Sequence, residues 1–436
     1  MTQLPARPAG SARGRRLAGS VLVAIGGAIV RLGALAGRLA TSRGPRAEVV
    51  LATRDASRVT GNLAAIAAGI ARELPGVRHR VIGYQTRHGI RGRMRTVLEA
   101  ARLGYHLSAA RLLVADDWLF PMFAVPTRRG TARIQVWHAA GAFKRFGFSV
   151  LDTTLGPGAA TDVVRMRANW DAVLVSSAAA APHFADAFRI APERCTSVIG
   201  LPRTDAQYDA ARVAATTATL RSRYGLDPRR RTLLYAPTFR GETMRDATSP
   251  TDLDLGALRD GLAQDWQVLL RLHPHVRHLG AAVARDLAGF VTDVSDWPEM
   301  NDLMPLADLL VTDYSSVIFE FSLLGRPMAF FTPDLERYTG DRGFYLDIPG
   351  DLPGPALTST SALLEHIRSG AWTHGGATAR DFAERWWDMA DGESTGRFLA
   401  MVVEPALRGA SVRLDPAPPA GRRRVLRAPA DDPAAG

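Results

Sequence analysis

The stretch LADLLVTDYSSVIFEFSLLGRP, residues 306–327, decides the fold class of this chain. An apolar run ends in Thr312 and Asp313, and a helical pattern of apolar residues follows Ser315 and Ser316. A buried strand that leads into a helix start is typical of a parallel sheet with crossover helices. Free backbone N–H groups at that start, together with two hydroxyls, favour a phosphate site. A helix cap made by Asp313 and the serines is the alternative interpretation.

Short apolar runs alternate with helical patterns on both sides of a polar, arginine-rich stretch. Strands are expected in the first half at 48–53, 79–84, 111–116, 133–138, 172–177 and 195–200. Strands are expected in the second half at 232–237, 267–273, 290–294, 308–313 and 327–332. The pattern predicts an α/β protein with two doubly wound domains, 47–205 and 232–410, joined by a linker at 206–231.

Composition restricts the partners of the chain. It has 436 residues, 47% of them hydrophobic, and a net charge of +11, which favours anionic partners such as nucleotides or an anionic membrane surface. Zinc-finger spacing and RNA-binding aromatic motifs are absent, so nucleic acid is not expected. A single cysteine, Cys195, excludes an internal disulfide. No acidic cluster indicates a bound metal, and no cofactor is expected.

Both ends of the chain have an unusual composition. Residues 1–46 contain the uncharged run LAGSVLVAIGGAIV, shorter than the roughly 20 residues of a membrane span. Arg16, Arg31 and Arg38 fall on one helical face, which predicts a helix lying on anionic lipid, with a signal peptide as the alternative. The tail at 411–436, which includes Arg422, Arg423 and Arg424, is expected to be a disordered basic and Pro-rich segment.

Two histidines at strand ends are candidates for chemistry. His138 precedes a loop of small residues, where a histidine can act as a general base and a ligand can approach the backbone. A histidine packed beside Trp137 is the alternative. In RLHPH, Arg271 and His273 present one permanent and one switchable donor, unless His273 is a satisfied core histidine.

Weaker candidates follow other strands. Arg203 in GLPRTD has the planar fork that suits phosphate, but a pair with Asp205 is equally compatible with the sequence. Pro237 and Thr238 in APTFR follow a strand and are suited to line a nucleotide pocket. Glu320 lies four residues after Ser316, one helical turn along, where a carboxylate suits ribose hydroxyls. Its alternative is a surface glutamate.

In order along the chain, six motifs resemble the CDP-glycerol glycerophosphotransferase family of teichoic acid synthesis: IQVWHAAGAFKRFG, GLPRTD, LYAPTFR, LLRLHPH, LVTDYSSVIFEFSLLGRP and PDLERYTGDRGFYLD. They span 133–356. The resemblance implies a GT-B fold of two facing Rossmann-like domains and a peripheral location on the cytoplasmic face of the membrane. It also implies transfer of glycerol phosphate from CDP-glycerol to a hydroxyl of a lipid-linked acceptor, with release of CMP.

The resemblance also implies roles for single residues. His138 matches the general base, and His273, also implied to be catalytic, forms with Arg271 the pair that contacts the donor diphosphate. Ser315 and Ser316 match the diphosphate-binding serines, and Glu320 stands where an aspartate that binds ribose is common. The positions implied to bind CDP-glycerol are His138, Ala139, Ala140, Gly141, Ala142, Arg203, Pro237, Thr238, Arg271, Leu272, His273, Ser315, Ser316 and Glu320.

The WHAAGAFK loop is more similar to priming members of the family than to polymerising ones. No motif reads the polyol, so CDP-ribitol is an alternative donor. A GT-B glycosyltransferase that uses a nucleotide-sugar is a rival within the same fold. A catalytically inactive scaffold of a cell-wall complex is a rival from another class.

Overall fold

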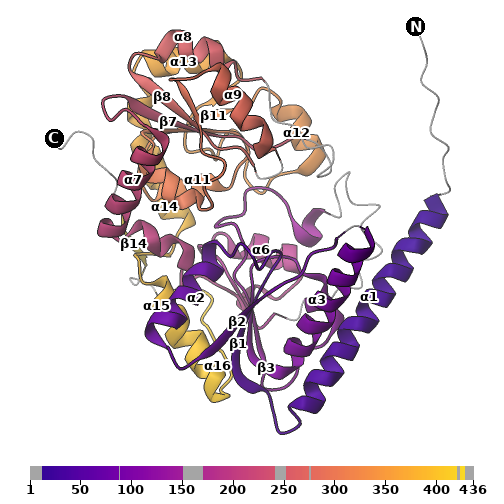
Figure 1. The fold of residues 1–436 in the computed structure, drawn as a ribbon. Helices are drawn as coiled ribbons and strands as arrows, with labels where there is room; N and C mark the ends of the chain where they lie inside the picture. The colour runs from indigo at the N-terminus through magenta and orange to yellow at the C-terminus, as the bar shows by residue number, and fades with distance from the viewer. Residues whose placement is uncertain are drawn as a thin grey trace.

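Two six-stranded parallel sheets form the centre of the molecule (Figure 1). The structure, a computed structural model, describes residues 12–87, 89–150, 170–240, 252–273, 276–419 and 423–427. The first sheet has the strand order β2-β1-β3-β4-β5-β6 and the second β12-β11-β10-β7-β8-β9. Read from its other edge, the second order is that of a Rossmann domain, and the first resembles the flavodoxin-like order. The predicted α/β fold with two doubly wound sheets is confirmed.

Every predicted strand is present in one of the two sheets. The first sheet contains β1 Arg46–Thr53, β2 Arg78–Gly83, β3 Ala110–Ala115, β4 Ala132–Gln135, β5 Ala172–Leu174 and β6 Cys195–Thr196. The second contains β7 Arg231–Ala236, β8 Trp266–Leu270, β9 Val291–Asp293, β10 Leu309–Thr312, β11 Met328–Phe331 and β12 Ala356–Leu357. Strand β4 stops earlier than predicted, because Trp137 has a φ of 49° and turns the chain out of the sheet.

Helices surround both sheets. Those before β7 are α1 Ala12–Ala40, α2 Gly61–Glu73, α3 Gly89–Ala109, α4 Phe120–Ala124, η1 Gly147–Val150, α6 Ala181–Phe188, η2 Pro192–Arg194, η3 Pro202–Gln207 and α7 Ala210–Tyr224. Those between β7 and β12 are α8 Leu255–Leu262, η4 Arg277–Leu279, α9 Gly280–Asp286, α10 Met300–Leu303, η5 Met304–Leu306, α11 Val317–Ser322 and α12 Leu335–Arg342. The last are α13 Thr360–Arg368, η6 Ala371–His374, α14 Gly375–Trp386, α15 Ser394–Phe398, η7 Leu399–Val403 and α16 Glu404–Arg408.

Helix α1 lies along α3 on the outside of the first sheet (Figure 1). Val30 and Ala34 are buried against its neighbours. A side chain at Gly33 or Gly37 would overlap the α3 backbone, so these glycines allow the two helices to approach closely. Helix α1 is therefore part of the first half's packing. The side chain of Arg16, which was expected to face lipid, lies outside the described residues.

Among the described residues, no helix is both long enough and apolar enough to cross a membrane.

The region expected to be a linker, 206–231, contains the whole of α7. Beyond the second sheet the chain returns to the first, where α15 packs on α2 and α16 on β1 (Figure 1). The sequence placed these helices in the second half; the boundaries 47–205 and 232–410 themselves stay predictions.

The described parts of the predicted tail contact the body of the protein. The Pro416 carbonyl accepts a bond from the Ser197 amide, and β14 Arg424–Val425 pairs with β13 Met389–Ala390. Arg423 forms an ion pair with Asp388 at 3.0 Å. Expected disorder therefore does not hold for 411–419 and 423–427, because these segments find hydrogen-bond partners in the body. Arg422 lies outside the described residues.

Candidate active site

The strand order of each sheet reverses at one point. In the second sheet this point lies between β7 and β10, and in the first between β1 and β3. Polar contacts bridge both points: the Thr238 hydroxyl donates to Asp313 at 3.0 Å, and the Thr53 hydroxyl donates to Asp116 at 3.2 Å. Ligands of open α/β sheets bind beyond the carboxyl ends of the strands at such points. The two points are where a two-sided site is expected.

His138 stands in the loop after β4 with a fixed ring. Its Nδ1 lies 3.0 Å from the main-chain oxygen of Asp116. Because a carbonyl only accepts, Nδ1 carries the proton in the neutral ring and Nε2 is left as an acceptor. The Gln135 side chain accepts from the Trp137 amide at 2.9 Å, and the rings of Trp137 and His138 lie 4.2 Å apart. The ring therefore packs beside Trp137, as in the packed alternative, and still has Nε2 left as an acceptor; its role as a general base stays a prediction.

The pKa of His138 is lowered, mainly because protein atoms surround the ring and disfavour its charged form. Asp117 opposes this shift and the Arg203 guanidinium adds to it. The residue is nonetheless exposed to solvent. A ring that is neutral at physiological pH and accessible to a ligand is suited to accept a proton.

Asp116 and Asp117 are residues that the sequence analysis did not select. Burial raises the pKa of Asp116 to about 7, although the Thr53 hydroxyl opposes the shift. Asp117 forms an ion pair with Arg54 at 2.8 Å, and this pair lies beside the carbonyl that holds His138. Two successive carboxylates at the end of a predicted strand were the available signal.

Arg203 joins the two halves of the site. Its guanidinium donates through Nη1 to the main-chain oxygen of His138, and its Nε lies 3.2 Å from Glu320 on α11. The Arg203 amide donates to Asn62 at 3.0 Å, and the Asn62 side chain donates to the Val136 oxygen at 2.7 Å. Arg203 is therefore tied to the loop of His138. It does not pair with Asp205, which accepts from the amides of α15 instead.

Glu320 is buried, which contradicts the alternative of a surface glutamate. Only 3% of the residue is exposed. Burial raises its pKa, and Arg203 is the nearby cation that opposes the shift. The carboxylate predicted to bind ribose thus lies at the junction between the halves, paired with the arginine predicted to bind the donor.

The small loop after His138 serves packing as well as access. A side chain at Gly141 would overlap the ring of Phe319 on α11. Ala140 and Ala142 are fully buried, whereas Ala139 is half-buried. Lys144 lies over the ring of Tyr338 at 5.0 Å. The loop thus contacts both halves of the molecule.

In the second half, Asp313 binds neighbouring strand ends together instead of capping α11. Its carboxylate accepts from the Thr238 amide at 2.9 Å and from Arg240 at 2.7 Å. Arg240 also pairs with Asp334 at 2.7 Å, and the two carboxylates raise its pKa. This cluster of Arg240 and two aspartates was not predicted. Pro237, between Ala236 and Thr238, is buried.

Arg271 and His273 follow β8 as predicted. Arg271 donates to the Ser295 main-chain oxygen at 2.5 Å, and its pKa is lowered by burial and by the charge of Arg58 from the first half. The Leu272 amide donates to the Ser295 hydroxyl at 2.9 Å. The ring of His273 lies 4.7 Å from Phe239 and is half-buried. Pro274 and His275 of the same motif lie outside the described residues.

Ser315 and Ser316 lie at the start of α11 and are half-buried. Ser316 makes no side-chain cap, and Ser315 accepts from the Val317 amide at the long distance of 3.4 Å. The capping alternative is therefore poorly supported. Helix α11 ends at Ser322, earlier than the apolar pattern indicated, so its dipole contributes less than a long helix would.

The family model described as CDP-Glycerol:Poly(glycerophosphate) glycerophosphotransferase matches residues 40–404. The chain belongs to this family. A teichoic acid ribitol-phosphate primase of Bacillus spizizenii is 36% identical over 367 residues, 83% of this chain and 92% of the primase. A teichoic acid glycerol-phosphate primase of the same species is 30% identical over 70% of this chain and 78% of that primase.

A variant of the wall teichoic acid polymerase TagF shares the fold. Its structure matches with a TM-score of 0.71 at 20% sequence identity, over 90% of this chain and 98% of that chain. The family predicted from the motifs is confirmed, and the primases above agree with the primase-like loop. This glycerophosphotransferase family member is therefore an enzyme of teichoic acid or related cell-wall polymer synthesis.

Proposed function

We propose that this glycerophosphotransferase family member transfers a polyol phosphate from a CDP-alcohol to a hydroxyl of a lipid-linked acceptor and releases CMP. The observation that carries the proposal is His138: its Nδ1 faces the Asp116 carbonyl at 3.0 Å, and Nε2 is left to accept a proton. The loop of His138 is connected through Arg203 to Glu320 on α11, the helix that follows the two serines. In this proposal, His138 as the base and the serines before α11 as the phosphate-binding segment belong to one site.

In the proposed reaction, the acceptor hydroxyl attacks the β-phosphorus of the donor and its proton moves to Nε2 of His138. A new P–O bond forms to the acceptor, the bond to the bridging oxygen breaks, and CMP leaves with the electron pair. Arg271, His273 and the two serine hydroxyls would donate to the diphosphate, where negative charge develops. Glu320 would accept hydrogen bonds from the ribose hydroxyls. Its carboxylate would then bind the ribose and Arg203 at the same time.

The sequence predicts CDP-glycerol as the donor, and CDP-ribitol is the second candidate because a relative named a ribitol-phosphate primase is 36% identical to this chain. Purified protein incubated with either donor and a lipid-linked acceptor distinguishes them by kcat/KM for CMP release. A higher value with CDP-glycerol supports the first assignment. A higher value with CDP-ribitol replaces it, and turnover of UDP- or GDP-sugars alone would contradict the proposal.

We also propose a peripheral location on the cytoplasmic face of the membrane. Ile25, Leu32 and Leu39 recur at seven-residue intervals on α1 and are 53%, 67% and 71% exposed. Arg31 and Arg38 are exposed beside this apolar stripe. An apolar stripe with flanking cations is suited to the interface of an anionic bilayer.

Deletion of α1 is a poor test, because it would uncover the core around Val30 and Ala34. The double variant Leu32→Ser and Leu39→Ser should lose most binding to vesicles that contain an anionic lipid, measured by co-sedimentation. Leu279→Ser, the same change at an exposed leucine of the second half, should bind like the wild type. Equal binding by all three proteins would refute the location.

A further inference from the structure

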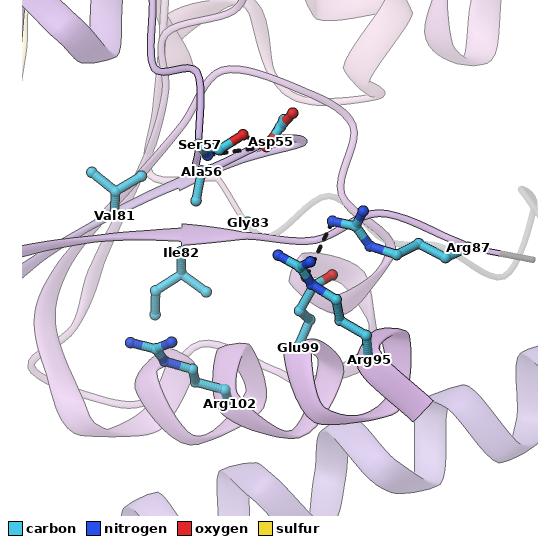
Figure 2. A pocket seen from close by; sticks show the side chains of 10 residues that line it. All are labelled: Asp55, Ala56, Ser57, Val81, Ile82, Gly83, Arg87, Arg95, Glu99 and Arg102. Carbon is cyan, nitrogen blue, oxygen red and sulfur yellow. Dashed lines mark hydrogen bonds and ion pairs between the residues drawn. The ribbon is translucent and has the colours of Figure 1, made fainter. Parts of the chain in front are cut away.

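A pocket lined by three arginines lies at the edge of the first sheet, apart from the residues assigned above (Figure 2). It has a volume of about 120 Å³, several times the space that one water molecule needs. Its walls are the turn after β1, the end of β2, and α3. The lining residues with charged or hydroxyl groups are Asp55, Ser57, Arg87, Arg95, Glu99 and Arg102.

Helix α3 has three different faces: one is charged, one is apolar and buried, and one is apolar and exposed. Arg95, Glu99 and Arg102 are spaced four and three residues apart, so they share the face that lines the pocket. Leu103 and Leu107, on a second face, are fully buried. A third face is exposed and apolar, and its members are Ile90, Met94, Val97 and Leu98. One helix therefore places a basic pocket next to an apolar surface.

The carboxylates of the pocket leave some of its guanidinium N–H groups without a carboxylate partner. Arg87 and Arg95 contact Glu99 at 3.3 and 3.0 Å, each through one nitrogen (Figure 2). The Nε of Arg87 is buried without a hydrogen-bond partner among the described residues. Figure 2 marks no bond between Arg102 and the other residues that line the pocket. Three guanidinium groups face two carboxylates, which leaves the pocket cationic.

The Asp55 turn places one ionised carboxylate, whose hydrogen bonds are made within the turn, at the wall of the pocket. The Asp55 carboxylate accepts from the Ser57 amide at 3.0 Å and from its hydroxyl at 2.6 Å. These bonds lower the pKa of Asp55, and the charges of Arg87 and Arg95 lower it further. A guanidinium presents paired N–H groups that match the oxygens of a phosphate.

The pocket lies on the same sheet edge as His138 but not beside it. It adjoins the ends of β1 and β2, whereas His138 follows β4. With a strand spacing of about 4.8 Å, the two positions are about 12 Å apart. A phosphate held in the pocket is therefore a different group from the one that reacts near His138.

We infer that this pocket is the subsite for the phosphate of the lipid-linked acceptor, a phosphate or diphosphate that joins its sugar to its lipid. The inference rests on the proposed function. The exposed apolar face of α3 lies next to the pocket, where the lipid part of such an acceptor would leave the protein. The reacting hydroxyl, at the other end of the acceptor, would lie near His138.

The test compares Arg102→Gln and the double variant Arg95→Gln, Arg102→Gln with Arg93→Gln, an exposed arginine of α3 outside the pocket. Arg102 is exposed and forms no ion pair with another residue that lines the pocket, so its variant should fold. The KM for a lipid-diphosphate acceptor should rise about tenfold or more in the pocket variants, since hydrogen bonds to a charged group are lost. Their kcat and their KM for the CDP-alcohol should stay within about twofold of Arg93→Gln.

Two further arms separate the sources of the phosphate. On an acceptor with the same sugar but an uncharged alkyl glycoside, the pocket variants and Arg93→Gln should have equal KM; a rise there too would overturn the subsite. Loss of binding to anionic vesicles with an unchanged acceptor KM would assign the pocket to lipid headgroups and also overturn it.

A binding measurement is independent of turnover. Calorimetric titration with inorganic pyrophosphate should detect a binding event in the wild type and in Arg93→Gln that the double variant lacks. If this event is present and no CDP-alcohol is turned over, the proposed function fails while the anion site stands. If all three proteins titrate alike, the anion site is refuted.

Discussion

At the scale of single residues, His138 has its tautomer set by main-chain geometry. The Asp116 carbonyl accepts a hydrogen bond from Nδ1, which leaves Nε2 of this exposed residue as an acceptor. The backbone acceptor remains when the Asp116 side chain is changed, so the orientation of the base depends on the strand ends more than on any one neighbour. We therefore expect removal of the His138 ring to lower kcat and to leave binding of the CDP-alcohol largely unchanged.

His138→Ala should lower kcat by about 10²–10⁴-fold, the usual contribution of a general base. The Kd for the CDP-alcohol, measured by calorimetry, should change less than about threefold. The control is His374→Ala, an exposed histidine in η6 of the second half. Weakened donor binding with an unchanged kcat would assign His138 to binding instead.

The pH dependence follows from the direction of the His138 shift. A general base works when neutral, and burial lowers the pKa of His138 from the ordinary 6.5. A plot of kcat/KM against pH should therefore stay level from neutral pH to below 6.5 and then fall as the ring takes up a proton. An acid limb centred above pH 6.5 in the free enzyme would show that a group other than His138 is titrated.

The pair of Arg203 and Glu320 should behave as a buried ion pair. Arg203→Met leaves an unpaired carboxylate that is 3% exposed, and should lower the free energy of unfolding by about 3–5 kcal/mol. The double variant Arg203→Met, Glu320→Leu should recover much of that loss in urea denaturation. Additive losses in the two single variants and the double variant would mean that the pair is not coupled.

At the scale of elements, the loop after His138 and helix α11 fit each other through Gly141 and Phe319. Because a Cβ at Gly141 would lie inside the Phe319 ring, the contact requires the absence of a side chain. The loop carries the proposed base, and α11 follows the proposed diphosphate-binding serines. The contact between Gly141 and Phe319 therefore helps to set the distance between His138 and the two serines.

Gly141→Ala should lower the unfolding free energy by about 1–3 kcal/mol through overpacking and should also reduce kcat/KM. Adding Phe319→Leu should restore part of both losses, because it removes atoms from the overlap. Gly76→Ala is the control, since that glycine has open space around it and an ordinary φ. A Gly141→Ala protein with wild-type stability and kinetics would contradict the role given to this contact.

The strands and the end-of-strand residues could be predicted because apolar runs and the polar residues that follow them are local signals. Helix α11 ended early, and β4 stopped before Trp137, because tertiary contacts decide element ends. The partner of Arg203 was not predictable, since Glu320 is far away in sequence. The same is true of Arg240, which two distant aspartates hold.

At the scale of the whole molecule, the chain crosses between its halves more than once. Helix α7 follows the first sheet, and after the second sheet α15 and α16 return to pack on α2 and β1. Composition alone did not show this return. Arg111 on β3 donates to the main-chain oxygen of Leu407, which ties the end of the chain to the first sheet. The return crossing makes the C-terminal helices part of the framework that holds the first sheet.

The central claim is transfer of the donor's β-phosphorus together with its polyol. The direct measurement uses a CDP-alcohol labelled with ³²P in the phosphate next to the polyol, incubated with the full chain and a lipid-linked acceptor. We expect the label to enter the acceptor and unlabelled CMP to appear in equal amount. Label retained in released CDP would show that the polyol moves without its phosphate, and would contradict the account.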